Sequence, residues 1–366
     1  MIPCVSRALA SLVGTGLVLS ALACGPEPED QATSSEDLVA FLEAPPPPPA
    51  AWAPLIGEYS SGPDTLSILE DSQRLYALFW KGGGQGLEAT SDSTFQMTGN
   101  GGTLTFRWED PSESGRDVAG LALGSLDYAK LNLGGGEGAT FKIIPLRPPE
   151  ELRTEALASV PPEEDGDFLP SDLVELVDLD PTIRLDIRYA TTNNFMGEVF
   201  YSSPQAFLQR PAAEALVRAH EWLKERGFGL MIHDGYRPWY VTKMFWDATP
   251  PHLKNFVADP AAGSRHNRGC AIDLTLYDLE TGEVVLMPAG FDEMSPRSNA
   301  DFPGGTSRQR WYRKLLRDAM DAQGFEVFPD EWWHFDYEDW RRYRIGNKVF
   351  AEIGEAEGVS GPGISR

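Results

Sequence analysis

Residues 264–278, SRHNRGCAIDLTLYD, read as a loop that runs into a β-strand. In residues 272–277 apolar side chains alternate with others, so the apolar set can face a core while Asp273 faces the opposite side of the sheet. Gly269 permits a sharp backbone turn between this strand and His266. One imidazole and one carboxylate placed in this way suit two of the three protein ligands of an open zinc site.

A second stretch, EWWH at residues 331–334, supplies another imidazole and a carboxylate three residues before it. His266, Asp273 and His334 form a two-His, one-carboxylate set, which leaves a fourth position for water, as in catalytic zinc sites. Zinc would lower the pKa of that water to about 7, and Glu331 could accept its proton if a tight turn brings Glu331 and His334 to the same side. In a flat strand the two would face apart. Either stretch alone could be a hydrogen-bonded structural pair, but the chain has only 5 His, and two of them lie here.

A third motif, DGYRP at residues 234–238, follows an apolar segment that ends at His233 and reads as a strand. Arg237, placed in the turn after this strand, could stabilise the oxyanion that forms when hydroxide attacks a carbonyl. The structural alternative for Arg237 is an ion pair with Asp234.

The N-terminus predicts export. Residues 1–23 carry Arg7 and then a run of small and apolar residues that is too short to span a membrane, which is typical of a signal peptide. The run ends at Cys24, the predicted lipidation site, although an ordinary secretory signal with a chance cysteine is the alternative. The proline-rich residues 24–53 predict a semi-stiff linker. We therefore expect an exported lipoprotein of the cell envelope, facing the periplasm or on the outer membrane, which meets a membrane only through this anchor.

Charge and cysteine content limit the partners and cross-links of the chain. The 31 Lys and Arg against 55 Asp and Glu, a net charge of −24, argue against nucleic acid and against electrostatic docking on anionic lipid. Cys4 leaves with the signal, and Cys24 lies at the new terminus. Cys270 then has no cysteine partner, so we expect the folded mature protein to contain no internal disulfide.

Two folded domains are expected after the linker. Residues 54–147 hold short alternating segments, the last at 139–144, separated by glycine runs; they have no His or Cys and predict a small all-β barrel or sandwich without chemistry of its own. Residues 148–167, rich in Pro and Glu, read as a second linker. Residues 168–350 predict an α+β domain, a central antiparallel-type sheet with flanking helices near 212–223 and 308–323. Residues 351–366 predict a disordered tail.

The three motifs, DGYRP, SxHxxGxAxD and EWWH in this order, resemble those of the zinc D-alanyl-D-alanine dipeptidases, the family that includes the enzyme of vancomycin-resistance clusters. The resemblance covers about residues 178–341 and implies one zinc ion per chain on His266, Asp273 and His334. It implies Glu331 as catalytic base and Arg237 as the group that stabilises the transition state. The implied substrate contacts are Ser264 for the carboxylate, Asp292 for the free amino group, and Tyr189 and Tyr201 for the pocket walls. The export signal, the anchor and the β domain depart from the family pattern, and residues 287–289 (MPA) replace its Met-Gly-small pattern beside Asp292.

Three functions compete on these grounds. The resemblance favours hydrolysis of D-Ala-D-Ala to free D-alanine outside the cytoplasm, in cell-wall metabolism. A related zinc D,D-carboxypeptidase or endopeptidase that trims peptidoglycan stem peptides is the second, and a non-catalytic wall-binding module is the third. Glu331 and Arg237 argue against the third, because a binding module needs neither a base nor an oxyanion donor.

Overall fold

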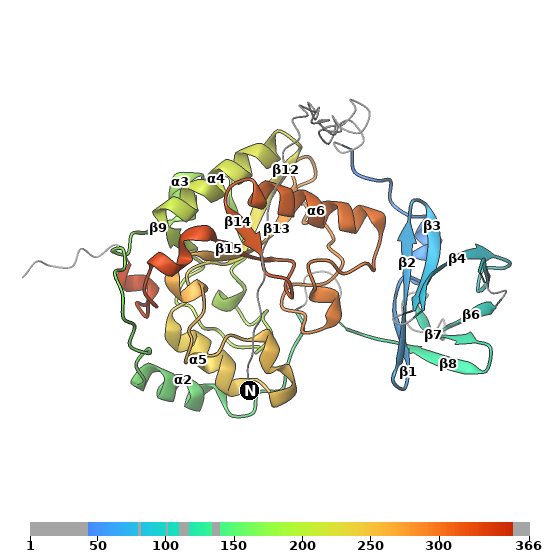
Figure 1. The fold of residues 1–366 in the computed structure, drawn as a ribbon, viewed down its shortest axis with the longest axis horizontal. Helices are drawn as coiled ribbons and strands as arrows, with labels where there is room; N and C mark the ends of the chain where they lie inside the picture. The colour runs from blue at the N-terminus through green and yellow to red at the C-terminus, as the bar shows by residue number, and fades with distance from the viewer. Residues whose placement is uncertain (1–42, 80–81, 100–101, 110–116, 134–139, 354–366) are drawn as a thin grey trace, which may run out of the picture. The chain divides into compact units, whose positions relative to one another are not determined.

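The computed structural model describes residues 43–79, 82–99, 102–109, 117–133 and 140–353 (Figure 1). The predicted signal peptide, the predicted lipidation site Cys24, most of the first predicted linker and nearly all of the predicted tail lie outside these residues. Within the described ranges, no helix has the length and apolar character needed to cross a membrane.

The first domain is a closed antiparallel barrel in which each strand pairs with the next and β1 pairs with β8. Its inward-facing side chains alternate with outward ones, as in β2, where Leu66 and Ile68 are buried on either side of the half-buried Ser67. The structure therefore selects the barrel over the sandwich. Its strands are β1 (Gly57–Ser61), β2 (Asp64–Asp71), β3 (Arg74–Phe79), β4 (Gly83–Ala89), β5 (Thr94–Met97), β6 (Thr103–Trp108), β7 (Val118–Leu123) and β8 (Leu126–Lys130).

The boundary between the domains differs from the prediction. Residues 140–144, the described part of the segment expected as a last strand of the β domain, lie outside the barrel, and Ile143 N donates to Phe195 O of the second domain at 2.9 Å. The expected second linker contains α2 (Pro149–Ala158), whose Leu152 and Ala156 are buried in the core of the second domain. These two residues lie at i and i+4 on one face of the helix. Two apolar positions are too few to predict a helix in a segment otherwise rich in Pro and Glu. In the described residues, the second domain thus also takes in residues 140–158, which lie before the predicted start at 168.

The second domain is built on a five-stranded sheet in the order β10-β12-β13-β15-β14. Only β10 and β12 run parallel, so the expected antiparallel sheet holds for the other pairs. The central strand β13 is buried on both faces from Ala271 to Tyr277. The strands are β10 (Arg184–Leu185), β12 (Phe228–Asp234), β13 (Ala271–Asp278), β14 (Phe325–Val327) and β15 (His334–Tyr337); β9 (Leu173–Glu175) and β11 (Phe207–Gln209) form a separate pair.

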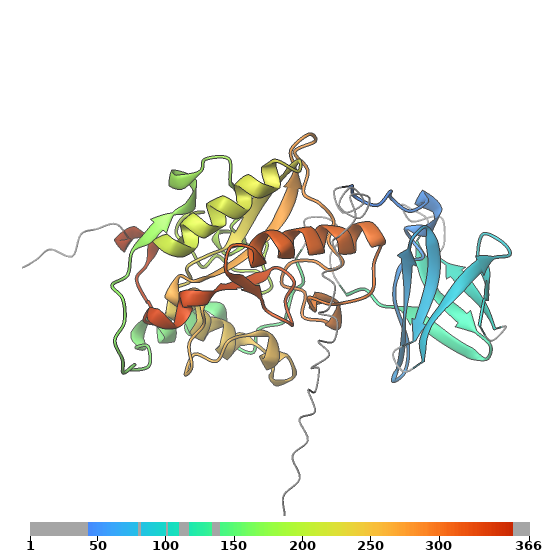
Figure 2. The ribbon, with the colours of Figure 1, turned by 45° about the horizontal axis from the view of Figure 1, so that its top comes forward.

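Helices cover this sheet. Figures 1 and 2 show α4 (Arg210–Lys224) and α6 (Ser307–Asp321) along one side of it and α2 with α5 (Trp239–Ala248) on the other. Both predicted helices are present as α4 and α6, and Gly227 and Gly324, which follow them, adopt the left-handed backbone common at helix ends. The remaining helical segments are α3 (Leu176–Leu179) and the 3-10 turns η1 (Ala50–Trp52), η2 (Arg188–Ala190), η3 (Pro251–Phe256), η4 (His266–Arg268), η5 (Pro296–Ser298), η6 (Glu338–Arg342) and η7 (Phe350–Glu352).

Candidate metal centre and active site

Three elements bring the predicted metal ligands together. His266 lies in η4, Asp273 near the start of β13, and His334 at the first position of β15. The antiparallel register of β13 and β15 pairs Asp273 directly with His334. Gly269, with φ +67°, turns the chain between η4 and β13, as its residue type predicted.

The facing atoms of these ligands form a small triangle. His334 Nδ1 lies 3.1 Å from both His266 Nε2 and Asp273 Oδ1, and the third side, from His266 Nε2 to Asp273 Oδ1, measures 3.4 Å. Bonds to zinc of about 2.0–2.1 Å at tetrahedral angles place neighbouring ligand atoms about 3.3 Å apart. All three side chains are buried. The residues present therefore fit a zinc ion with one open coordination position.

Each histidine is oriented by a hydrogen bond on its far side. His266 Nδ1 donates to Gly235 O at 2.8 Å, and His334 Nε2 donates to Asp336 Oδ1 at 2.9 Å. Each bond keeps the proton on the outer nitrogen, so the inner nitrogen presents its lone pair to the site. Our sequence reasoning missed Asp336, although its position two residues after His334 on a strand places both on one face.

Glu331 reaches the same side as His334 because residues 331–334 form a turn. His334 N donates to Glu331 O at 3.2 Å, and Glu331 Oε2 lies 3.7 Å from His334 Nδ1. Burial raises the pKa of Glu331 from 4.5 to about 7; the charge of His334 opposes this rise and that of Asp273 adds to it. A carboxyl with such a pKa, at this distance from a metal ligand, is suited to act as a general base near neutral pH.

Arg237 makes the ion pair with Asp234 and also faces the site. Its Nε and Nη2 each lie 2.8 Å from Asp234 Oδ2, and Nη2 lies 3.5 Å from Asp273 Oδ2. Asp234 is held in turn by the hydroxyl of Tyr201, which donates to Oδ1 at 2.7 Å. Tyr201 therefore lies behind Asp234 and is not among the residues that line the cavity, so its predicted place in the pocket wall was wrong.

The other predicted site residues line one cavity of about 390 Å³. Tyr189 donates its hydroxyl to Asp292 Oδ2 at 2.9 Å. Burial, with the nearby charge of Asp273, raises the pKa of Asp292 well above its ordinary range. Ser264 Oγ accepts the amide of His266 at 3.2 Å. Of the two adjacent tryptophans, only Trp333 is in the wall. Wall residues that sequence reasoning missed include Phe195, Phe245, Phe256, Val257, Asp259, Arg265, Met294, Phe328 and Trp340.

Comparisons with known proteins agree with this geometry. A family model described as D-ala-D-ala dipeptidase matches residues 170–350. The D-alanyl-D-alanine dipeptidase of Escherichia coli (strain K12) is 39% identical over 169 residues, which cover 45% of this chain and 86% of the relative. The chain belongs to the D-ala-D-ala dipeptidase family. The D-alanyl-D-alanine dipeptidases of Enterococcus faecium and Streptomyces coelicolor are 36% and 37% identical, over 87% and 91% of their own lengths.

The D-ala-D-ala dipeptidase family consists of zinc metallopeptidases, so this chain is an enzyme of that class. The matched residues contain the ligand triangle, Glu331, Arg237, Asp336 and the whole cavity wall. The barrel formed by β1 to β8 precedes them.

Proposed function

We propose that the protein hydrolyses D-Ala-D-Ala to free D-alanine with one zinc ion per chain, held by His266, Asp273 and His334. The observation that carries this proposal is one small cavity whose wall holds the ligand triangle, Glu331, Arg237 and a third carboxylate, that of Asp292. A cavity of about 390 Å³ suits a dipeptide of small residues.

Zinc in this position would polarise the peptide carbonyl and lower the pKa of the attacking water to about 7. Glu331 accepts the proton of that water on its carboxylate and can return it to the amine that leaves. Because burial already raises the pKa of Glu331 to about 7, the carboxyl can hold the proton between these two events.

Arg237 stabilises the charge that develops on the carbonyl oxygen. Its guanidinium is fixed by Asp234 before substrate enters, so little reorganisation is needed during the reaction. Tyr189 and Phe245, whose rings lie 5.2 and 5.0 Å from the guanidinium carbon, shield this group from water and strengthen its electrostatic effect.

The two ends of the substrate meet groups of different chemistry. Ser264, beside the ligand His266, offers a hydroxyl to the carboxylate end. Asp292, partly buried in the cavity wall, offers a carboxylate to the ammonium end, and the ammonium would add a cation in direct contact to the nearby charge of Arg237. An acylated amine would leave the carboxylate unpaired, so blocked and longer peptides should be poor substrates.

Export and a role in cell-wall metabolism are part of the proposal. Residues 1–23 and Cys24 support a lipid-anchored protein outside the cytoplasm, where wall-derived dipeptides arise. Cell fractionation with mass spectrometry of the mature N-terminus tests it. A lipid-modified N-terminal Cys24 is expected, and a cytoplasmic protein that keeps residues 1–23 would contradict it.

The test of the activity compares kcat/KM for D-Ala-D-Ala, N-acetyl-D-Ala-D-Ala and a wall stem pentapeptide. We expect the free dipeptide to be preferred by at least about a hundredfold, because an unpaired buried charge costs several kcal/mol. Equal rates would favour the stem-trimming function, and absence of turnover would favour a binding module. If Asp292→Ala discriminates as well as the wild type, the amine is bound elsewhere.

A further inference from the structure

The barrel contacts the second domain through two buried carboxylates. Glu58 on β1 and Glu70 on β2 are 6% and 0% exposed, although both lie on a barrel. Glu70 Oε2 accepts the amide of Ser307, the first residue of α6, at 2.9 Å. Next to it, Asp71 pairs with Arg310 of α6 at 2.8 Å.

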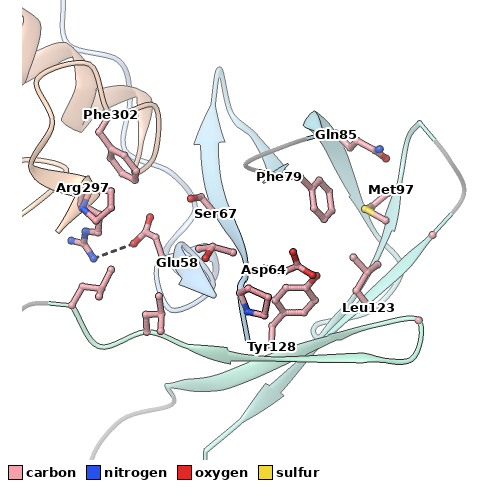
Figure 3. Close-up of a pocket in the computed structure, with 18 of the residues that line it drawn as sticks. Glu58, Asp64, Ser67, Phe79, Gln85, Met97, Leu123, Tyr128, Arg297 and Phe302 are labelled. Atoms are coloured by element: carbon pink, nitrogen blue, oxygen red, sulfur yellow. Dashed lines mark hydrogen bonds and ion pairs between the residues drawn. The ribbon is translucent and has the colours of Figure 1, made fainter. Parts of the chain in front are cut away.

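Glu58 faces a different part of the second domain. Its Oε2 lies 3.2 Å from Nη1 of Arg297 in η5, and this pair forms part of the wall of a cavity of about 1090 Å³ (Figure 3). A carboxylate that faces outward from a β-barrel is normally solvated, so its burial here indicates that it has a partner in the second domain. Arg297 is the cation that compensates it.

Arg297 also holds the segment that carries Asp292. Its Nη2 donates to Pro288 O at 3.0 Å, and its Nε lies 3.2 Å from Glu293 Oε1. Glu293 is 1% exposed, and its Oε2 accepts the amide of Gly290. One guanidinium thus joins the barrel to two points of the chain, one on each side of Asp292.

Asp292 needs such support because its backbone is strained. Its φ is +57°, a left-handed conformation that residues other than glycine rarely adopt. Strained residues persist only where the surroundings hold them, and they gather at ligand-binding positions. The hydrogen bond from Tyr189 fixes the side chain of Asp292, whereas Pro288 and Glu293 fix the backbone around it.

We infer that the barrel is a positioning element of the active site: Glu58, through Arg297, holds residues 288–293 so that Asp292 is placed to bind the substrate's ammonium group. This inference rests on the proposed dipeptidase function. Glu58 and Arg297 touch no reacting atom in this scheme. They set affinity for the amino end of the substrate, and zinc binding and the chemical step do not depend on them.

The experiment compares Glu58→Ala with Asp71→Ala in the full mature chain. Asp71→Ala is the matched control, because it removes another ion pair between the barrel and the second domain without touching residues 288–297. Glu58→Gln is a third variant, which keeps an oxygen that can accept from Arg297. For each variant we would measure KM and kcat on D-Ala-D-Ala, zinc content, and hydrogen exchange of residues 287–300.

For Glu58→Ala we expect KM to rise about tenfold, within the hundredfold that a displacement of about 1 Å can cause. We expect kcat within about twofold of the wild type, unchanged zinc, and faster exchange in residues 287–300. Glu58→Gln should show a smaller rise in KM and a smaller increase in exchange. If Glu58→Ala does not fold, the result for Glu58→Gln tests the inference in its place. Asp71→Ala should match the wild type.

Wild-type KM and exchange in Glu58→Ala would overturn the inference, as would equal effects in Asp71→Ala, which would indicate loosening of the whole domain contact. If the wild type cleaves no dipeptide, the proposed function fails. Hydrogen exchange then still decides whether Glu58 holds the segment, because it does not depend on turnover.

Discussion

Replacing Glu331 by Gln tests the role of this side chain as a general base. The amide has nearly the same shape but can neither accept the proton of water nor ionise. The proposed mechanism predicts that Glu331→Gln keeps zinc, since the ligand triangle is intact, and loses turnover by about 10²–10⁴-fold, the usual contribution of a positioned general base. This corresponds to about 2.7–5.5 kcal/mol of transition-state stabilisation.

The same substitution should stabilise the metal-free protein at alkaline pH. Burial raises the pKa of Glu331 from 4.5 to about 7, so between these pH values the folded state keeps a proton that the unfolded state has lost. The free energy of unfolding therefore falls as pH rises through this window, by roughly 3 kcal/mol in total. Glu331→Gln removes this loss, and the metal-free variant should be more stable than the wild type at pH 8 but not at pH 4.

The assay pairs steady-state kinetics with denaturant unfolding of the metal-free proteins at the two pH values. In the wild type, kcat/KM should fall as pH drops below the pKa of Glu331, because a protonated carboxyl cannot act as a base. Wild-type turnover in Glu331→Gln would refute the mechanism, and loss of zinc would make Glu331 a ligand. Equal stability of both proteins at pH 8 would mean that burial does not raise the pKa of Glu331.

Two further predictions concern the support of the site and the extent of the domain. Asp336→Asn should lower zinc affinity about 10–100-fold, because it weakens the hydrogen bond that orients His334, and competition with a chelator measures this; unchanged affinity would contradict the role of Asp336. A chain that starts at Phe168 lacks α2, whose apolar residues belong to the core, so it should be insoluble or should unfold at a lower temperature when followed by circular dichroism. A chain that starts at Thr140 keeps α2, so it should fold and bind zinc, but without the barrel its KM should be raised. A stable, fully active chain from Phe168 would contradict both the domain boundary and the role of the barrel.

Periodic patterns predicted the elements that have one apolar face, such as α4 and α6. They missed α5, since residues 239–248 are aromatic or apolar nearly all round and most of them are buried. The ligands were predictable because short motifs carry them on a strand and a tight turn. The partner Asp336 and the cavity wall formed by residues 255–263 were not predictable, because tertiary packing decides which loop lies over the site. The contact between Glu58 and Arg297 joins residues far apart in sequence and has no local pattern at all.

The most direct test of the central claim is the titration of the metal-free protein with zinc, followed by the release of free D-alanine from D-Ala-D-Ala. Activity is expected to rise linearly and to saturate at one zinc ion per chain, and His266→Ala and His334→Ala should neither retain zinc nor regain activity. Activity that is independent of zinc, or that survives in either histidine variant with zinc still bound, would contradict it.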